Sequence, residues 1–254
     1  MVVVKKGQIT VFIILGILLL VAFSMAIFVM NFMTTADIIE EQGDYSTTDS
    51  IQLYIESCLE TAAVTSLVNI SSYGGYYNLP LYSTTGAYIN VPYFIRFGTS
   101  YLPESVSISE NTEHFFEDAF DDCIDLEIFD AYTFSGELEY VEVSINDDSV
   151  DFDLYYPLVA ENLDGSQTEF SLFSTNIDAN LLIMFNIASE ITNNQLEHAE
   201  YVCISCLALL GNQYQMDITT VDTIDGTYFQ IEDPQFEEQY GEVLMFRFIH
   251  KYYD

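Results

Sequence analysis

The sequence of 254 residues contains no tryptophan and only five lysine and arginine residues together. Two of them, Lys5 and Lys6, lie at the N-terminus, so the rest of the chain has only Arg96, Arg247 and Lys251 against all 40 acidic residues. These counts give everything after Lys6 a formal charge of −37. No basic patch is present to neutralise phosphates, and we therefore expect no nucleic-acid partner.

A charge of this size normally penalises the compact state through self-repulsion. The Debye length, however, falls to about 3 Å at 1 M salt, where such repulsion is screened. The composition therefore indicates an acidic surface adapted to brine. Half of the residues are apolar, including 19 tyrosines and 19 phenylalanines, so the chain has enough material for a core and is not a disordered polyanion.

Motifs that carry catalysis are missing as well. The three histidines, His114, His198 and His250, are far apart and none belongs to a HExxH spacing. There is no Gly-x-Ser-x-Gly and no glycine-rich phosphate loop. We predict a protein that is not an enzyme, with no cofactor and no metal site.

A long uncharged run is present near the N-terminus. No acidic or basic residue falls between Lys6 and Asp37, and residues 9–33 are almost entirely apolar. As a helix rising about 1.5 Å per residue, this run exceeds the roughly 30 Å hydrocarbon core of a bilayer. We predict a basic leader over 1–7 and a single transmembrane helix over 8–33.

The charges flanking this run predict its orientation. The two lysines precede it, and the next basic residue is Arg96. This asymmetry keeps the N-terminus cytoplasmic and places the remainder outside the cell membrane. A removable secretory signal is the alternative, but the run is longer than the roughly 7 to 15 residues of its apolar region.

The leader Lys5-Lys6-Gly7-Gln8-Ile9-Thr10-Val11-Phe12 resembles the processing site of archaeal class III, pilin-like signal peptides. The resemblance implies cleavage between Gly7 and Gln8, with the apolar helix retained on the mature protein. Many pilin-like proteins carry Glu at the fifth mature position, where it pairs with the amino terminus of a neighbouring subunit. This chain carries Phe12 there.

Beyond the leader, four segments resemble a group of uncharacterised archaeal proteins with the same leader. They are Ile55-Glu56-Ser57-Cys58-Leu59-Glu60, Tyr73-Gly74-Gly75-Tyr76, Cys123, and Val202-Cys203-Ile204-Ser205-Cys206. The resemblance implies a common architecture for this exported part and no established activity.

Four amphipathic helices are predicted after a polar stalk over 34–50. Apolar residues recur at helical spacing over 51–67, 108–124, 181–191 and 198–210. Gly211 is placed to end the last helix as its C-cap.

Period-two alternation predicts the strands. Residues 141–145 and 150–156 form a hairpin around a polar turn, and 168–174 form a third strand. Strands over 216–221, 228–231 and 243–249 complete the chain, and the last is apolar on both faces except for Arg247, as in the centre of a sheet. We predict an α+β fold, with antiparallel strands and amphipathic helices in one domain over 51–254.

Four cysteines in an exported chain predict two disulfides, with three possible connectivities. Cys58 and Cys123 lie on apolar helix stripes and should point inward. Cys203 and Cys206 are three residues apart on a predicted helix. A bond between them would strain a mid-helix turn, whereas bonds to the other two cysteine-bearing helices would join three elements. They could instead form a redox pair or, with the other two, a zinc site.

These observations lead to a functional hypothesis. We expect a membrane-anchored archaeal cell-surface protein with a structural, adhesive or interaction role, whose partners are the membrane and other surface proteins or copies of itself. A pilin-like filament subunit and an extracytoplasmic thiol oxidoreductase using Cys203 and Cys206 are the alternatives. Asn69-Ile70-Ser71 is a glycosylation sequon that predicts modification of Asn69.

The charge leads to a first test. We expect the exported domain to unfold as salt is lowered, because 37 net negative charges are then poorly screened. Circular dichroism across a salt titration measures this. A melting temperature that stays unchanged from molar to millimolar salt would contradict adaptation to brine.

Overall fold

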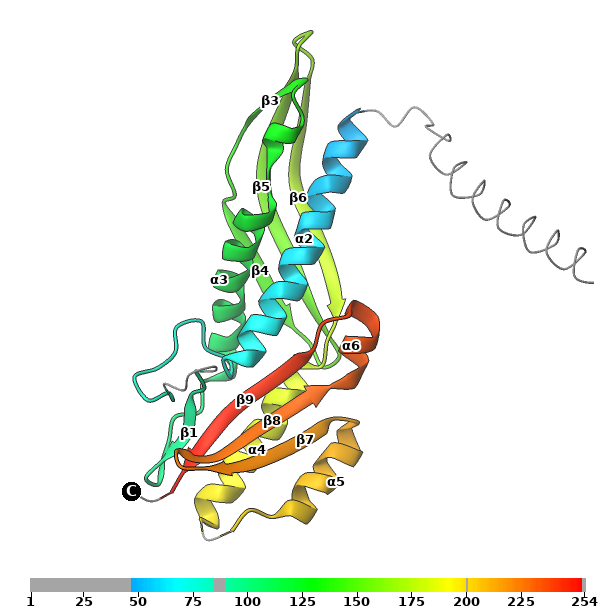
Figure 1. Ribbon diagram of the computed structural model, residues 1–254. Coiled ribbons are helices and arrows are strands. Elements are labelled where there is room, and N and C mark those ends of the chain that lie inside the picture. Colours follow the sequence, from blue (N-terminus) through cyan, green and yellow to red (C-terminus); the bar gives the residue numbers. More distant parts are fainter. Residues whose placement is uncertain (1–46, 85–89, 200, 253–254) are drawn as a thin grey trace, which may run out of the picture. The chain divides into compact units, whose positions relative to one another are not determined.

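The structure is a computed structural model that describes residues 47–84, 90–199 and 201–252 (Figure 1). The predicted leader and transmembrane helix, with Gly7 and Gln8, lie outside the described residues, as does the stalk up to residue 46. The last four stalk residues, 47–50, already belong to a helix. Within the described ranges, no helix has the length and apolarity needed to cross a bilayer.

Two of the predicted helices form with longer bounds than their apolar stripes indicated. Helix α2 covers Thr47–Ser72 and α3 covers Ser105–Cys123. One face of each helix is fully buried, because apolar residues recur every three or four positions. Most acidic residues of α3 lie on its outer face in contact with water, whereas the half-buried Glu113 accepts from the backbone N–H of Val143.

The predicted hairpin belongs to the first sheet. Strands β4 (Tyr140–Ile145) and β5 (Ser149–Asn162) pair antiparallel, as do β5 and β6 (Gln167–Asp178). The short strand β3 (Tyr132–Ser135) pairs with the far end of β5. Every second residue of β5 is buried, which confirms the alternation read from the sequence.

The second sheet has the order β2-β1-β9-β8-β7. Its strands are β1 (Tyr93–Arg96), β2 (Thr99–Ser100), β7 (Asp217–Thr223), β8 (Gly226–Asp233) and β9 (Leu244–Lys251). The predicted central position of the last strand is confirmed, since β9 lies between β1 and β8.

The expectation of antiparallel strands alone is wrong, because β1 and β9 pair parallel. No hairpin connects these two strands, which come from opposite ends of the domain. Their relative direction therefore depends on tertiary packing and not on a local turn. The domain is α+β, with one antiparallel and one mixed sheet.

Three helices occur in the C-terminal half. Helix α4 (Leu181–Glu197) packs against β8 and β9, while α5 (Ile204–Tyr214) packs against β7 and α4. The predicted helix over 198–210 is shifted: Gly211 lies inside α5, and the helix ends at Gln215 in the left-handed conformation. A Cβ at position 211 would lie 2.7 Å from the carbonyl oxygen of Met216. The glycine is therefore explained by this close approach and not by a position at the end of the helix.

Helix α6 (Pro234–Tyr240) was not predicted from its spacing, although Pro234 at its first position is typical of a helix start. The carboxylate of Asp233 caps it by accepting from the backbone of Gln235, and also accepts from the side chain of Asn180 at the start of α4. One buried side chain thus fixes the starts of two helices.

Aromatic rings make up the centre of the second sheet. The ring of Phe248 on β9 stacks between Phe94 on β1 and Phe229 on β8, at centroid distances of 4.7 and 5.1 Å. All three are fully buried, and they belong to one continuous core that also contains the inner faces of α2, α3 and the first sheet. Stacking across three strands fixes their register.

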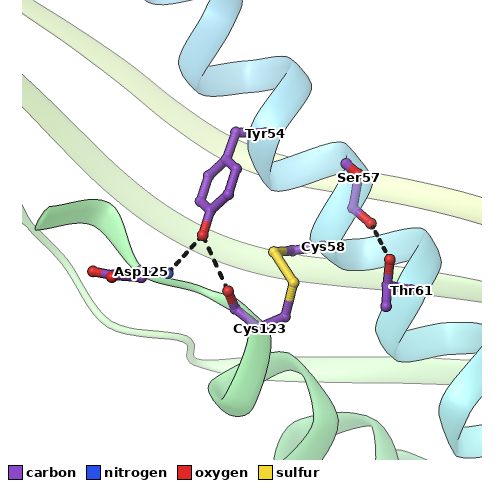
Figure 2. The surroundings of a disulfide bond; sticks show 6 residues. All are labelled: Tyr54, Ser57, Cys58, Thr61, Cys123 and Asp125. Carbon is purple, nitrogen blue, oxygen red and sulfur yellow. Dashed lines mark hydrogen bonds between the residues drawn. A yellow bond between two sulfur atoms is a disulfide. The ribbon is translucent and has the colours of Figure 1, made fainter. Parts of the chain in front are cut away.

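A disulfide between Cys58 and Cys123 joins α2 to the end of α3 (Figure 2). Beside it, the hydroxyl of Tyr54 donates to the carbonyl of Cys123 and accepts from the backbone of Asp125. Tyr54 thereby satisfies backbone groups left unpaired where α3 ends. Closing a loop of 65 residues stabilises the fold by roughly 4 kcal/mol in the chain-entropy model.

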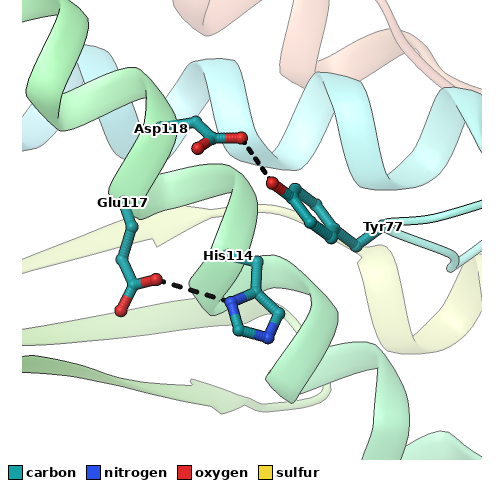
Figure 3. Close-up of polar contacts among 4 residues, drawn as sticks. All are labelled: Tyr77, His114, Glu117 and Asp118. Atoms are coloured by element: carbon teal, nitrogen blue, oxygen red, sulfur yellow. Dashed lines mark hydrogen bonds and ion pairs between the residues drawn. The ribbon is translucent and has the colours of Figure 1, made fainter.

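The segment after α2 packs against the exposed face of α3 (Figure 3). The hydroxyl of Tyr77 donates to Asp118 at 2.8 Å, and its ring contacts His114, which pairs with Glu117. The hydrogen bond to the Asp118 carboxylate raises the pKa of Tyr77. His114, isolated in the sequence, therefore has a surface packing role.

The turn ending α2 has a steric requirement that can be tested. Gly74 has a φ of +60°, and an added Cβ would lie 2.6 Å from the carbonyl oxygen of Arg247. Gly98 is the matched control, with a φ of +78° and no atom within 4 Å of its Cβ position. We expect G98A to cost about 1 kcal/mol of unfolding free energy and G74A about 3 kcal/mol or more. Equal costs in denaturant titrations would contradict the close approach at Gly74.

Candidate functional site

The second disulfide, between Cys203 and Cys206, lies where α5 begins. Helix α4 ends at Glu197 with His198 as its C-cap, and α5 starts at Ile204. Cys203 is the N-cap, with φ −76° and ψ 83°. It is therefore outside the helix, and the expected objection that a Cys203–Cys206 bond would strain a mid-helix turn does not apply.

The two disulfides differ in their access to solvent. Cys58 is 2% exposed and Cys123 is half-buried, as the predicted inward orientation required. Cys206 is exposed and Cys203 half-buried, and the intervening Ile204 is 60% exposed. All four cysteines are paired, so two predicted disulfides are confirmed and their connectivity is assigned.

Helix α5 presents a polar group to the sulfur of its N-cap. The backbone N–H of Cys206 donates to Cys203 Sγ at 3.3 Å, and Ser205 Oγ lies 3.6 Å from the same sulfur. An N–H donor and the positive end of a helix stabilise a thiolate relative to a thiol. After reduction, Cys203 is the cysteine of the pair whose anion this geometry favours.

A cavity of about 120 Å³ adjoins this disulfide. Its walls come from α4, from the segment before α5 and from α5 itself. The lining residues are Glu190, Ile191, Asn194, Gln195, Val202, Cys203, Cys206, Leu207 and Leu210. The lining is mostly apolar, with both sulfur-bearing residues on one side.

A buried polar network lies behind the cavity and holds the segment before α5 in place. Gln195 on α4 donates from Nε2 to the carbonyl of Tyr201 at 3.0 Å and accepts from the hydroxyl of Tyr252. The Tyr252 hydroxyl also contacts His250 Nδ1 at 3.1 Å, and His250 Nε2 lies 3.1 Å from the hydroxyl of Thr192. The network thus connects β9 and α4 to the residues immediately preceding Cys203.

Burial sets the protonation of this network. His250 is fully buried against the rings of Phe229 and Phe248, and desolvation lowers its pKa to about 3. A neutral imidazole with its proton on Nδ1 donates to Tyr252, whose own hydroxyl donates to Gln195, while Nε2 lies beside the Thr192 hydroxyl, which donates to the carbonyl of Ala188. Burial likewise raises the pKa of Tyr252. Both groups are uncharged at neutral pH.

The sequence reasoning missed this network, because His250, Thr192, Gln195 and Tyr252 are not adjacent in the chain. The only available signal was a histidine near the end of a mostly apolar strand. Asn69 of the predicted glycosylation site is half-buried in α2, next to the buried Ser71, and its modification stays a prediction. Within the part of the chain that is described, no three potential metal-ligating side chains come together.

No protein-family model, curated protein or solved structure matches this chain. Two disulfides in a folded domain are consistent with an extracytoplasmic location, since such bonds persist in oxidising compartments.

The buried histidine predicts a pH dependence. Its pKa is near 6.5 in the unfolded chain and about 3 in the fold, so below pH 6.5 the unfolded state binds one more proton. Stability from His250 is complete above this pH and is lost as the pH falls toward 3. We expect wild type to lose about 1.4 kcal/mol per pH unit relative to H250F between pH 6 and 4.

Chemical denaturation of both proteins at constant salt gives this difference. The carboxylates titrate in both, so subtracting one protein from the other isolates His250. A difference that does not change with pH would show that His250 is not buried as a neutral group.

Proposed function

We propose that this chain is a membrane-anchored archaeal cell-surface protein whose exported domain makes structural or adhesive contacts. The observation that carries the proposal is the pairing of all four cysteines in disulfides within a folded domain, including the bond that joins α2 to the end of α3. Disulfides are rarely maintained in reducing compartments, so these bonds support a location outside the cytoplasm.

The membrane attachment rests on the sequence. The uncharged run over 9–33 provides the anchor, and the lysines before it set the orientation. The likeness of the leader to class III signal peptides supports processing between Gly7 and Gln8. The partners are then the membrane, other surface proteins and further copies of the chain.

The surface of the domain suits contacts made in brine. Several large apolar side chains are exposed among the acidic residues, including Leu81, Leu163 and Leu172, at 91%, 87% and 66%. At high salt, apolar contacts persist while charge repulsion between neighbouring molecules is screened. Adhesion under these conditions would depend on such residues more than on ion pairs.

Expression in a salt-adapted archaeal host tests location and processing together. We expect the chain in the membrane fraction, with a mature N-terminus at Gln8 and with its domain digested when protease is added to intact cells. The variant K5E/K6E removes the charge asymmetry and should reduce the protease-accessible fraction several-fold. Wild-type protein in the cytoplasm with four free thiols would overturn the proposal.

Isolation of fibres with the same mature N-terminus would identify the contacts as those of a filament subunit. Their absence, with the domain still exposed on cells, would leave an individual surface protein.

A further inference from the structure

The exposed disulfide combines three features that a structural bond does not need. It lies at the N-terminus of α5, one of its sulfurs accepts a backbone N–H, and a cavity adjoins it whose lining is apolar except for Glu190, Asn194 and Gln195. We propose that Cys203 and Cys206 form a thiol–disulfide exchange site for a dithiol carried on an apolar segment of another polypeptide. This activity is separate from surface contact and does not depend on it.

Access distinguishes this bond from the other one. Exchange requires a thiolate to reach a disulfide sulfur directly, so a bond enclosed by packing does not react until the fold opens. Cys58 is buried on the inner face of α2 and Cys123 is half-buried, whereas Cys206 lies exposed at the surface. The domain thus contains a more protected disulfide and a more accessible one, and each serves as an internal control for the other.

The geometry assigns a role to each sulfur. An incoming thiolate attacks the exposed Cys206 Sγ, a mixed disulfide forms, and the Cys203–Cys206 bond breaks. Cys203 leaves as a thiolate that the N–H of Cys206 and the helix terminus stabilise. A leaving thiol with a stabilised anion departs faster.

The second substrate thiolate then attacks the substrate sulfur of the mixed disulfide and releases Cys206. One disulfide is consumed and one is formed, two electrons pass to the Cys203–Cys206 pair, and the two substrate protons end on its sulfurs. The reverse sequence with a low-molecular-weight disulfide restores the oxidised pair.

The surroundings define the substrate class. Ile191, Leu207 and Leu210 line the cavity next to the sulfurs, and Ile204 and Leu209 of α5 are 60% and 70% exposed. Apolar side chains flanking a substrate thiol have a surface to pack against here. Burial of about 50 Å² of apolar area corresponds to roughly a tenfold gain in affinity.

The first experiment compares the two bonds in the full-length chain, held in detergent and molar salt. The protein is equilibrated in glutathione buffers of graded potential, alkylated and mapped by mass spectrometry. We expect Cys203 and Cys206 to become alkylated while Cys58 and Cys123 remain bonded and the circular dichroism is unchanged. Reduction of Cys203–Cys206 only together with Cys58–Cys123, or only on unfolding, would overturn the proposal.

The second experiment measures exchange. Oxidised chain is mixed with a synthetic dithiol peptide whose cysteines are flanked by leucines, and with a matched peptide flanked by serines. We expect the leucine peptide to be oxidised about tenfold faster, and neither to be oxidised above background by C203S/C206S. Wild type alkylated at Cys203 and Cys206 after mild reduction is a second inactive control that keeps the native sequence. Oxidation no faster with wild type than with these controls would refute exchange.

Single variants test the assignment of roles. C206S leaves Cys203 at the helix N-cap, and C203S leaves Cys206 in the first turn. The pH midpoint of iodoacetamide alkylation should be lower for Cys203 than for Cys206. Equal or reversed midpoints would overturn Cys203 as the leaving thiolate.

Discussion

Burial of apolar side chains is the interaction on which the rest of this structure depends. A chain with three basic residues beyond its leader and 40 acidic ones cannot offset its charge by ion pairing. Its few cations make other contacts, as Arg96 lies over the ring of Tyr82 and Arg247 donates to Gln230. Stability must come from the aromatic and aliphatic core, with hydrogen bonds that satisfy what the core encloses.

That core also positions the candidate site. The ring of Phe185 on α4 packs against Phe246 on β9, and α4 supplies Thr192 and Gln195 to the polar network. The network reaches the backbone of Tyr201, two residues before the N-cap of α5. The placement of Cys203 is therefore a consequence of buried contacts made by residues far from it in sequence.

The same domain uses disulfide chemistry in two environments. The Cys58–Cys123 bond closes a long loop and has one cysteine buried in the core, so its contribution is to stability. The Cys203–Cys206 bond closes a loop of only a few residues, and its entropic contribution is correspondingly small. Its exposure to solvent and its position at the N-terminus of α5 affect the reactivity of the bond more than the stability of the fold.

The sequence by itself determined the features that depend on local periodicity and composition. Alternation over 141–156 predicted β4 and β5, helical spacing predicted most of α2, α3 and α4, and a strand apolar on both faces placed β9 at the centre of its sheet. Each of these patterns lies within a single helix or strand, so it can be recognised without the tertiary structure.

Only the tertiary structure decided the rest. The parallel pairing of β1 with β9, the burial of His250 and the start of α5 at Cys203 all depend on contacts between distant segments. The disulfide pairing agrees with that helix start, because the bond from Cys203 to Cys206 does not strain a mid-helix turn when Cys203 lies outside the helix. A local sequence pattern does not specify which distant segments contact each other, because the free energy of packing depends on both segments together.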